Sequence, residues 1–232
     1  MYTIQEIIDL DNHLLQTVSG GGSAFFDGCI NAYVTPYLWL PLALVLLYVL
    51  LKNNSFKNFS VILLLMVAML GISYLLTIFL LQPLSDYLRS IYNTEALNLL
   101  DALNFYRAKN GSLLILATMV SSLGIFLMLL IRHAAFNVSL ALWAAIGCFA
   151  GVYTAANYPW DIVVGILLGL LCGTVAYKIF GNYMSRQRVR RDWVSNRYTK
   201  SGYEVSDIYL LLVFMYATFA ATPLVSFFIT LH

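Results

Sequence analysis

Charge is scarce in this chain of 232 residues: only 10% of them are Asp, Glu, Lys or Arg, whereas 61% are apolar. A soluble domain typically has roughly 25% charged residues, so the composition excludes water as the main solvent of the protein. The net charge of +2 is too small for a nucleic-acid-binding surface. We therefore expect a membrane protein without a nucleic-acid partner.

Cysteine and histidine are also scarce, and their spacing fits neither a disulfide framework nor a metal site. We accordingly expect no metal and no cofactor. The residues of these two types are Cys29, Cys148, Cys172, His13, His133 and His232.

The first 18 residues lack the basic start and continuous apolar stretch of a cleavable signal peptide. Their apolar residues instead recur at helical spacing, which predicts an amphipathic helix lying in the outer membrane interface over 1–18. Three glycines within 19–23 end this element, because glycine is costly to order in a helix.

Long apolar runs dominate the remainder. A helix needs about 20 mostly apolar residues to cross the hydrocarbon core, and six runs meet that length. They are 34–51, 58–81, 112–131, 137–156, 161–181 and 207–231.

The basic residues set the expected orientation. Ten of the 13 lie in or beside the connections 52–57, 132–136 and 182–206. Because positive residues favour the cytoplasmic side, we expect those connections inside and the loop 82–111 outside together with both termini. The basic connection 182–206 also suits anionic lipid headgroups.

Glycines at 165, 169 and 173 repeat every four residues in the fifth run. Such a stripe lets a neighbouring helix approach closely. We expect packing within the chain in preference to a dimer interface, because a bundle of six spans needs such seams.

A short motif near the fifth run carries a family resemblance. The sequence Asn-Tyr-Pro-Trp-Asp-Ile-Val-Val-Gly at 157–165 resembles the third signature of the type 2 phosphatidic acid phosphatase family. In that signature an arginine precedes a His-Tyr-Pro, and an aspartate follows four residues after the histidine. Phe-Phe-Asp at 25–27 and Trp-Leu-Pro at 39–41 are similar to bacterial members.

This resemblance covers about residues 5–181. It implies an all-α polytopic helix bundle in the bacterial inner membrane, with a family-like core of about five spans over 24–181. The basic connection 182–206 and an additional C-terminal span over 207–232 follow this core.

In the family, a histidine attacks phosphorus, an aspartate orients it, a second histidine protonates the leaving oxygen, and a lysine and arginines hold the phosphate oxygens. The first signature falls on 82–90, where Gln82 stands at the lysine and Arg89 matches an arginine. The second falls on 109–112, where Gly111 matches and Ser112 stands at the acid histidine.

The third signature has lost its nucleophile. Gly151 stands at the arginine and Asn157 at the attacking histidine, whereas Asp161 matches the orienting aspartate. Capping of the helix that it opens is sufficient to explain Asp161, and we prefer it to a catalytic remnant.

The resemblance therefore predicts a protein that is not an enzyme. It would bind a lipid or polyprenyl phosphate at the outer leaflet, or serve as a structural subunit of a cell-envelope complex. A partner would then contact the C-terminal helix or the basic connection. The alternatives are an active lipid-phosphate or polyprenyl-pyrophosphate phosphatase with a diverged site, and a lipid transporter.

A residual anion site is expected at the start of the third span, where free backbone amides meet the positive end of the helix dipole. Its basic side chains could equally extend to lipid headgroups, and its polar residues could simply cap the helix. The candidate phosphate-binding residues are Arg89, Arg107, Lys109, Asn110, Gly111 and Ser112.

Overall fold

A computed structural model describes residues 10, 13, 14, 17, 24–84, 87, 113–153, 159–185 and 197–230. The chain divides into two compact units. The first comprises Met1–Gly21, Ala68–Leu123 and Ala144–Gly173, and the second comprises Gly22–Val67, Gly124–Trp143 and Thr174–His232. The expected helix over 1–18 lies largely outside the described residues.

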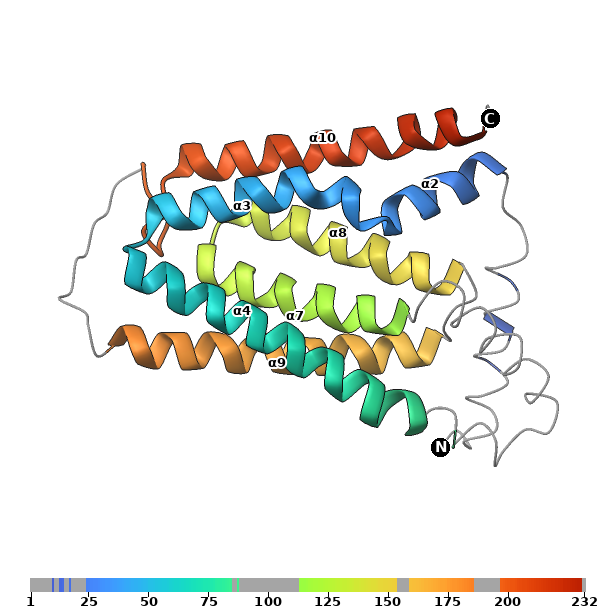
Figure 1. Ribbon diagram of the computed structural model, residues 1–232, viewed down its shortest axis with the longest axis horizontal. Coiled ribbons are helices and arrows are strands. Elements are labelled where there is room, and N and C mark those ends of the chain that lie inside the picture. Colours follow the sequence, from blue (N-terminus) through green and yellow to red (C-terminus); the bar gives the residue numbers. More distant parts are fainter. Residues whose placement is uncertain are drawn as a thin grey trace. The chain divides into compact units, whose positions relative to one another are not determined.

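Helices make up almost all of the described part of the chain (Figure 1). Apart from one isolated bridge between Tyr198 and Glu204, the described residues contain no β-structure. The elements are α2 Ala24–Val34, η1 Pro36–Trp39, α3 Leu40–Asn53, α4 Phe56–Leu76, the π-helix η2 Thr77–Leu81, α7 Leu113–Ile131, α8 Ala134–Tyr153, α9 Pro159–Ser185 and α10 Val205–Thr230.

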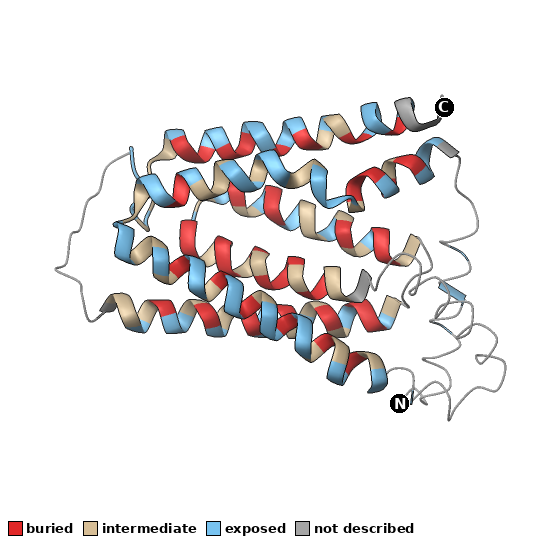
Figure 2. Cartoon of the chain, viewed as in Figure 1, coloured by how far each residue is buried: buried red, intermediate tan, exposed pale blue. Residues whose placement is uncertain are grey.

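Five stretches of the described residues are long and apolar enough to cross a membrane, and Ile115–Ile131 is a shorter apolar helix. Large apolar side chains are exposed along α3, α4 and α10, as surfaces that face lipid require (Figure 2). The prediction of an all-α polytopic membrane bundle is confirmed. The five stretches are Pro36–Asn53, Phe56–Leu84, Ala134–Tyr153, Pro159–Met184 and Val205–Phe227.

The first predicted span, 34–51, agrees with the apolar stretch Pro36–Asn53, but sequence analysis missed the helix before it. Helix α2 precedes it and packs against α10, with Ser226 Oγ donating to the Phe25 carbonyl at 2.7 Å. A Cβ on Gly28 would lie only 2.3 Å from Ser226 Oγ, so the missing side chain permits this approach. The two helices lie side by side in Figure 1.

A break in the chain separates α2 from α3. Thr35 is extended (φ −69°, ψ 119°) before Pro36, which starts the short 3-10 helix η1. Trp39 Nε1 donates to the Tyr33 carbonyl at 2.8 Å, so the indole of Trp39 satisfies a carbonyl at the end of α2. Trp39 also meets Trp143 and Phe219 edge-on, with ring centroids 5.7 and 5.8 Å apart.

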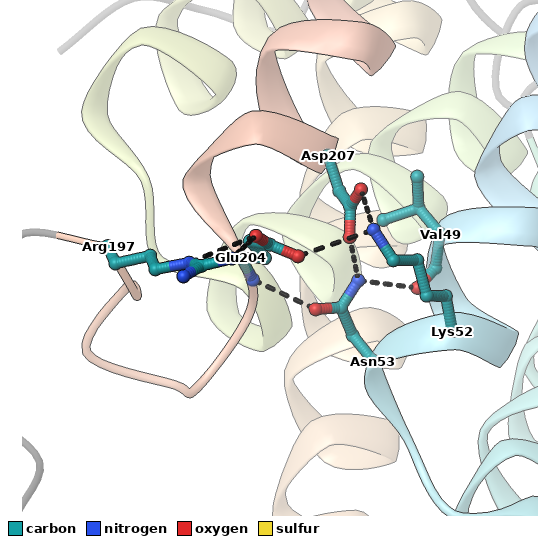
Figure 3. Close-up of polar contacts among 6 residues, drawn as sticks. All are labelled: Val49, Lys52, Asn53, Arg197, Glu204 and Asp207. Carbon is teal, nitrogen blue, oxygen red and sulfur yellow. Dashed lines mark hydrogen bonds and ion pairs between the residues drawn. The ribbon is translucent and has the colours of Figure 1, made fainter.

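A polar cluster joins the start of α10 to the end of α3 (Figure 3). The Asp207 carboxylate, 5% exposed, accepts from Lys52 Nζ at 2.7 Å and from Asn53 Nδ2 at 2.7 Å. Glu204 accepts from Lys52 at 3.3 Å and from Arg197 at 3.1 Å. We call these five residues the α3–α10 clamp; it pairs both carboxylates with cations, so neither charge is left uncompensated.

The clamp is built on a tight turn before α10. Thr199 N donates to the Tyr203 carbonyl at 2.8 Å, and Gly202 between them has φ +92°, which glycine tolerates best. Burial raises the pKa of Tyr203 to about 12. The hydrogen bond from Arg197, followed by that from Lys52, lowers the pKa of Glu204, so this carboxylate stays ionised in the clamp.

In the first unit, α9 approaches α7 at Gly169. A Cβ there would lie 2.4 Å from the Thr118 carbonyl oxygen and 2.8 Å from Ser121 Cβ. The predicted use of the glycine stripe for packing within the chain is confirmed at this position.

Gly169→Ala should therefore destabilise the protein by about 2 kcal/mol, the usual scale for overpacking, because the nearest obstacle is rigid backbone. Gly181→Ala on the same helix is the matched control, since a Cβ there meets nothing within 4 Å. It should be neutral or mildly stabilising. Thermal unfolding in detergent measures both, and equal melting temperatures for the two variants would contradict the close approach.

Asp207→Ala should cost about 2 kcal/mol, because it removes charge-assisted hydrogen bonds from Lys52 and Asn53 at once. Asp207→Asn keeps the shape and one acceptor and should cost less. The same thermal measurement tests both, and a melting temperature for Asp207→Ala equal to that of the unmodified protein would contradict a stabilising clamp.

Candidate functional site

Three of the predicted site positions lie among the described residues, namely Gln82, Gly151 and Asp161, and all belong to the first unit. The other predicted positions lie outside the described residues. They are Arg89, Arg107, Lys109, Asn110, Gly111, Ser112 and Asn157.

Asp161 lies in the first turn of α9, which begins at Pro159. Proline suits a helix start because its fixed φ is already helical and its missing N–H is not needed there. Asp161 is 8% exposed whereas Trp160 beside it is 53% exposed. The carboxylate therefore faces the protein interior at the positive end of the helix dipole, where negative charge is stabilised.

Gln82 follows the π-helix η2 at the end of α4, and its backbone N–H donates to the Thr77 carbonyl five residues earlier. Sequence analysis missed this π-helix and ended the second span at residue 81, but the helical stretch continues to Leu84. Proline normally clashes with the carbonyl four residues earlier. The wider π turn just before Pro83 shifts the hydrogen-bond register and eases that conflict.

Gly151 is buried near the C-terminal end of α8, directly after the fully buried Ala150. The position at which the family resemblance expects an arginine therefore has neither a side chain nor space open to solvent. Any cation that binds phosphate in this protein must come from elsewhere in the chain.

Hydroxyl groups form a set that sequence reasoning missed. In the first unit, Ser73, Thr77, Thr118, Ser121 and Ser122 are all at most 5% exposed. Thr77 Oγ1 donates to the Ser73 carbonyl at 2.8 Å, and Ser122 Oγ donates to the Met119 carbonyl at 2.9 Å. Small hydroxyl residues inside otherwise apolar runs were the available signal, since such side chains turn away from lipid.

Metal binding has no candidate among the described residues, since no group of three or more His, Cys, Asp or Glu side chains gathers there. Among the predicted site positions that the structure describes, the polar side chains are the carboxylate of Asp161 and the amide of Gln82. A carboxylate can orient or accept a proton, while an amide can only donate or accept hydrogen bonds.

These features define a multi-pass helical membrane protein with a buried carboxylate at a helix start. The chain is 28% identical over 178 residues to a protein of Bacteroides thetaiotaomicron named Lipid A 4'-phosphatase, covering 76% of this chain and 79% of that protein. No protein-family model matches the chain, and no solved structure matches it. The similarity agrees with the predicted resemblance to lipid-phosphate phosphatases.

The same similarity contradicts the prediction of a catalytically silent protein that is not an enzyme. That prediction was derived from the replaced positions Gln82, Ser112, Gly151 and Asn157, each judged against the chemistry of its signature. Similarity over three quarters of the chain to a named phosphatase favours the alternative of an active lipid phosphatase with a diverged site.

Proposed function

We propose that this protein is a membrane phosphatase that removes a phosphate group from a lipid, with a phosphorylated glycolipid of the lipid A class as its substrate. The observation that carries the proposal is the similarity to the Bacteroides Lipid A 4'-phosphatase. The apolar spans support it, because a lipid substrate also lies in the membrane.

The proposed reaction uses water directly. Asn157 offers no nucleophile, so a water oxygen attacks phosphorus while its proton passes to the Asp161 carboxylate. The bond from phosphorus to the ester oxygen breaks, and this oxygen leaves with the lipid and takes up a proton from solvent water. Arg89, Lys109 and the amides near Gly111 hold the phosphate oxygens, which is where phosphoryl transfer requires positive charge. The role is given to Asp161 because it is the one carboxylate among the predicted site positions that the structure describes, and it is buried.

Phosphate release from purified lipid A and from phosphatidic acid in detergent tests the activity. Asp161→Asn should lower kcat at least about 100-fold, the usual scale for loss of a general base. Its melting temperature should stay close to that of the unmodified protein, because asparagine also caps a helix start. Asp27→Asn is the control, because Asp27 is an exposed carboxylate on α2 and should leave turnover unchanged.

Three results would count against different parts of the proposal. Absence of release from either lipid contradicts a phosphatase of this substrate class. Release that persists in Asp161→Asn contradicts the role given to Asp161. Transfer of labelled phosphate to the protein would show that the reaction passes through a covalent intermediate, which contradicts direct attack by water.

The orientation proposed with this function puts both termini and the loop 82–111 on the outer face of the bacterial inner membrane. In a variant whose three cysteines are serines, Thr94→Cys should react with an impermeant maleimide in intact cells, whereas Ser195→Cys should react only after lysis. The asymmetry of the basic residues supports this expectation. Labelling of Ser195→Cys in intact cells would contradict the proposed orientation.

A further inference from the structure

Arg132 has an unusual backbone conformation. It directly follows α7 and has φ +55°, and it is the one non-glycine residue with positive φ among those that the structure describes. Its N–H donates to the Met128 carbonyl at 3.1 Å, which closes the helix. Glycine or asparagine fits such a cap with less strain, so the cap alone does not account for an arginine here.

The Arg132 side chain is held in place from two directions. Its Nε donates to the Leu129 carbonyl at 3.2 Å, and one terminal nitrogen donates to Tyr177 Oη at 2.8 Å. The guanidinium also lies over the Tyr177 ring, 5.7 Å from its centroid. A guanidinium has five N–H groups, so donors remain for a ligand, and the residue is exposed.

Two further exposed cations are chain neighbours of residues that hydrogen-bond to the end of α7 within the second unit. Ser201 Oγ donates to the carbonyl of Ile131, which brings the turn carrying Lys200 against the end of α7. Lys178 follows Tyr177 in α9, and both lysines are exposed. The carboxylates Glu204 and Asp207 are engaged by Lys52 and Arg197.

The position of Arg132 in the membrane protein indicates which kind of ligand its guanidinium can reach. Only Arg132 and His133 separate α7 from α8, two apolar helices of 19 and 20 residues. A junction between helices of this length lies at the level of lipid headgroups. The anions available at that level are headgroup phosphates, which arginine binds through paired N–H groups.

We propose that Arg132 binds the phosphate of an anionic membrane lipid at the end of α7, with Lys178 and Lys200 adding positive charge to the surface. This site is separate from the proposed phosphatase site, and it is independent of whether the protein hydrolyses lipid. The prepositioned guanidinium distinguishes it from a diffuse attraction between basic loops and the membrane.

Arg132→Gly separates binding from folding, because glycine relieves the backbone strain at this position while the substitution removes the guanidinium that would bind the phosphate. The full-length protein is purified in a mild detergent and titrated with phosphatidylglycerol or phosphatidylcholine, and retained lipid is counted by native mass spectrometry. The unmodified protein should retain phosphatidylglycerol preferentially. Arg132→Gly should retain about five-fold less, the effect expected for one basic residue at a membrane surface, with a melting temperature in phosphatidylcholine that is no lower than that of the unmodified protein.

Arg132→Lys and Lys57→Gln are the controls. Arg132→Lys keeps the charge but loses the paired donors, so it should retain an intermediate amount of phosphatidylglycerol. Lys57→Gln removes one exposed cation from the first turn of α4 and should leave phosphatidylglycerol retention unchanged.

Three outcomes would overturn the proposal. One is unchanged phosphatidylglycerol retention in Arg132→Gly. Another is an equal loss in Lys57→Gln, which would indicate diffuse surface charge. The third is stabilisation by glycerol phosphate without any preference for phosphatidylglycerol, which would assign the site to a soluble phosphate.

Discussion

The Asp207 carboxylate, shared between Lys52 Nζ and Asn53 Nδ2, is the interaction on which the second unit depends. In a chain with 10% charged residues, a buried carboxylate is costly unless a cation and hydrogen bonds compensate its charge. The clamp supplies both and fixes where α10 starts relative to the end of α3. Towards its other end α10 is held differently, by close backbone approach at Gly28 and Ser226.

The described site positions depend on local backbone features more than on long-range pairing. Gln82 follows a π turn, and Asp161 follows Pro159 in the first turn of α9. Both are therefore placed at helix ends, where backbone groups without intrahelical partners and dipole ends meet polar side chains. A reacting group held at a helix end is positioned by the whole helix behind it, which is one way to keep geometry rigid inside a membrane.

Hydropathy and proline positions predicted the membrane bundle and most helix boundaries within a few residues, because burial in lipid depends mainly on composition. They could not predict α2 beside α10, since that packing depends on a missing Cβ at Gly28 and a hydroxyl at position 226. The π turn before Pro83 was equally hidden, because it depends on hydrogen-bond register. The sequence analysis correctly predicted that Asp161 lies at a helix start. It also predicted an inactive protein from the replaced signature positions, and the similarity to a phosphatase contradicts that prediction.

The bond from Ser226 to the carbonyl of Phe25 joins residues 201 positions apart in the chain. During synthesis, α2 leaves the ribosome long before its packing partner exists. Until α10 has been inserted, the bare backbone at Gly28 lacks the hydroxyl against which it packs. Docking of α2 is therefore a late step of folding, and a chain cut before α10 would lack the surface to which α2 binds.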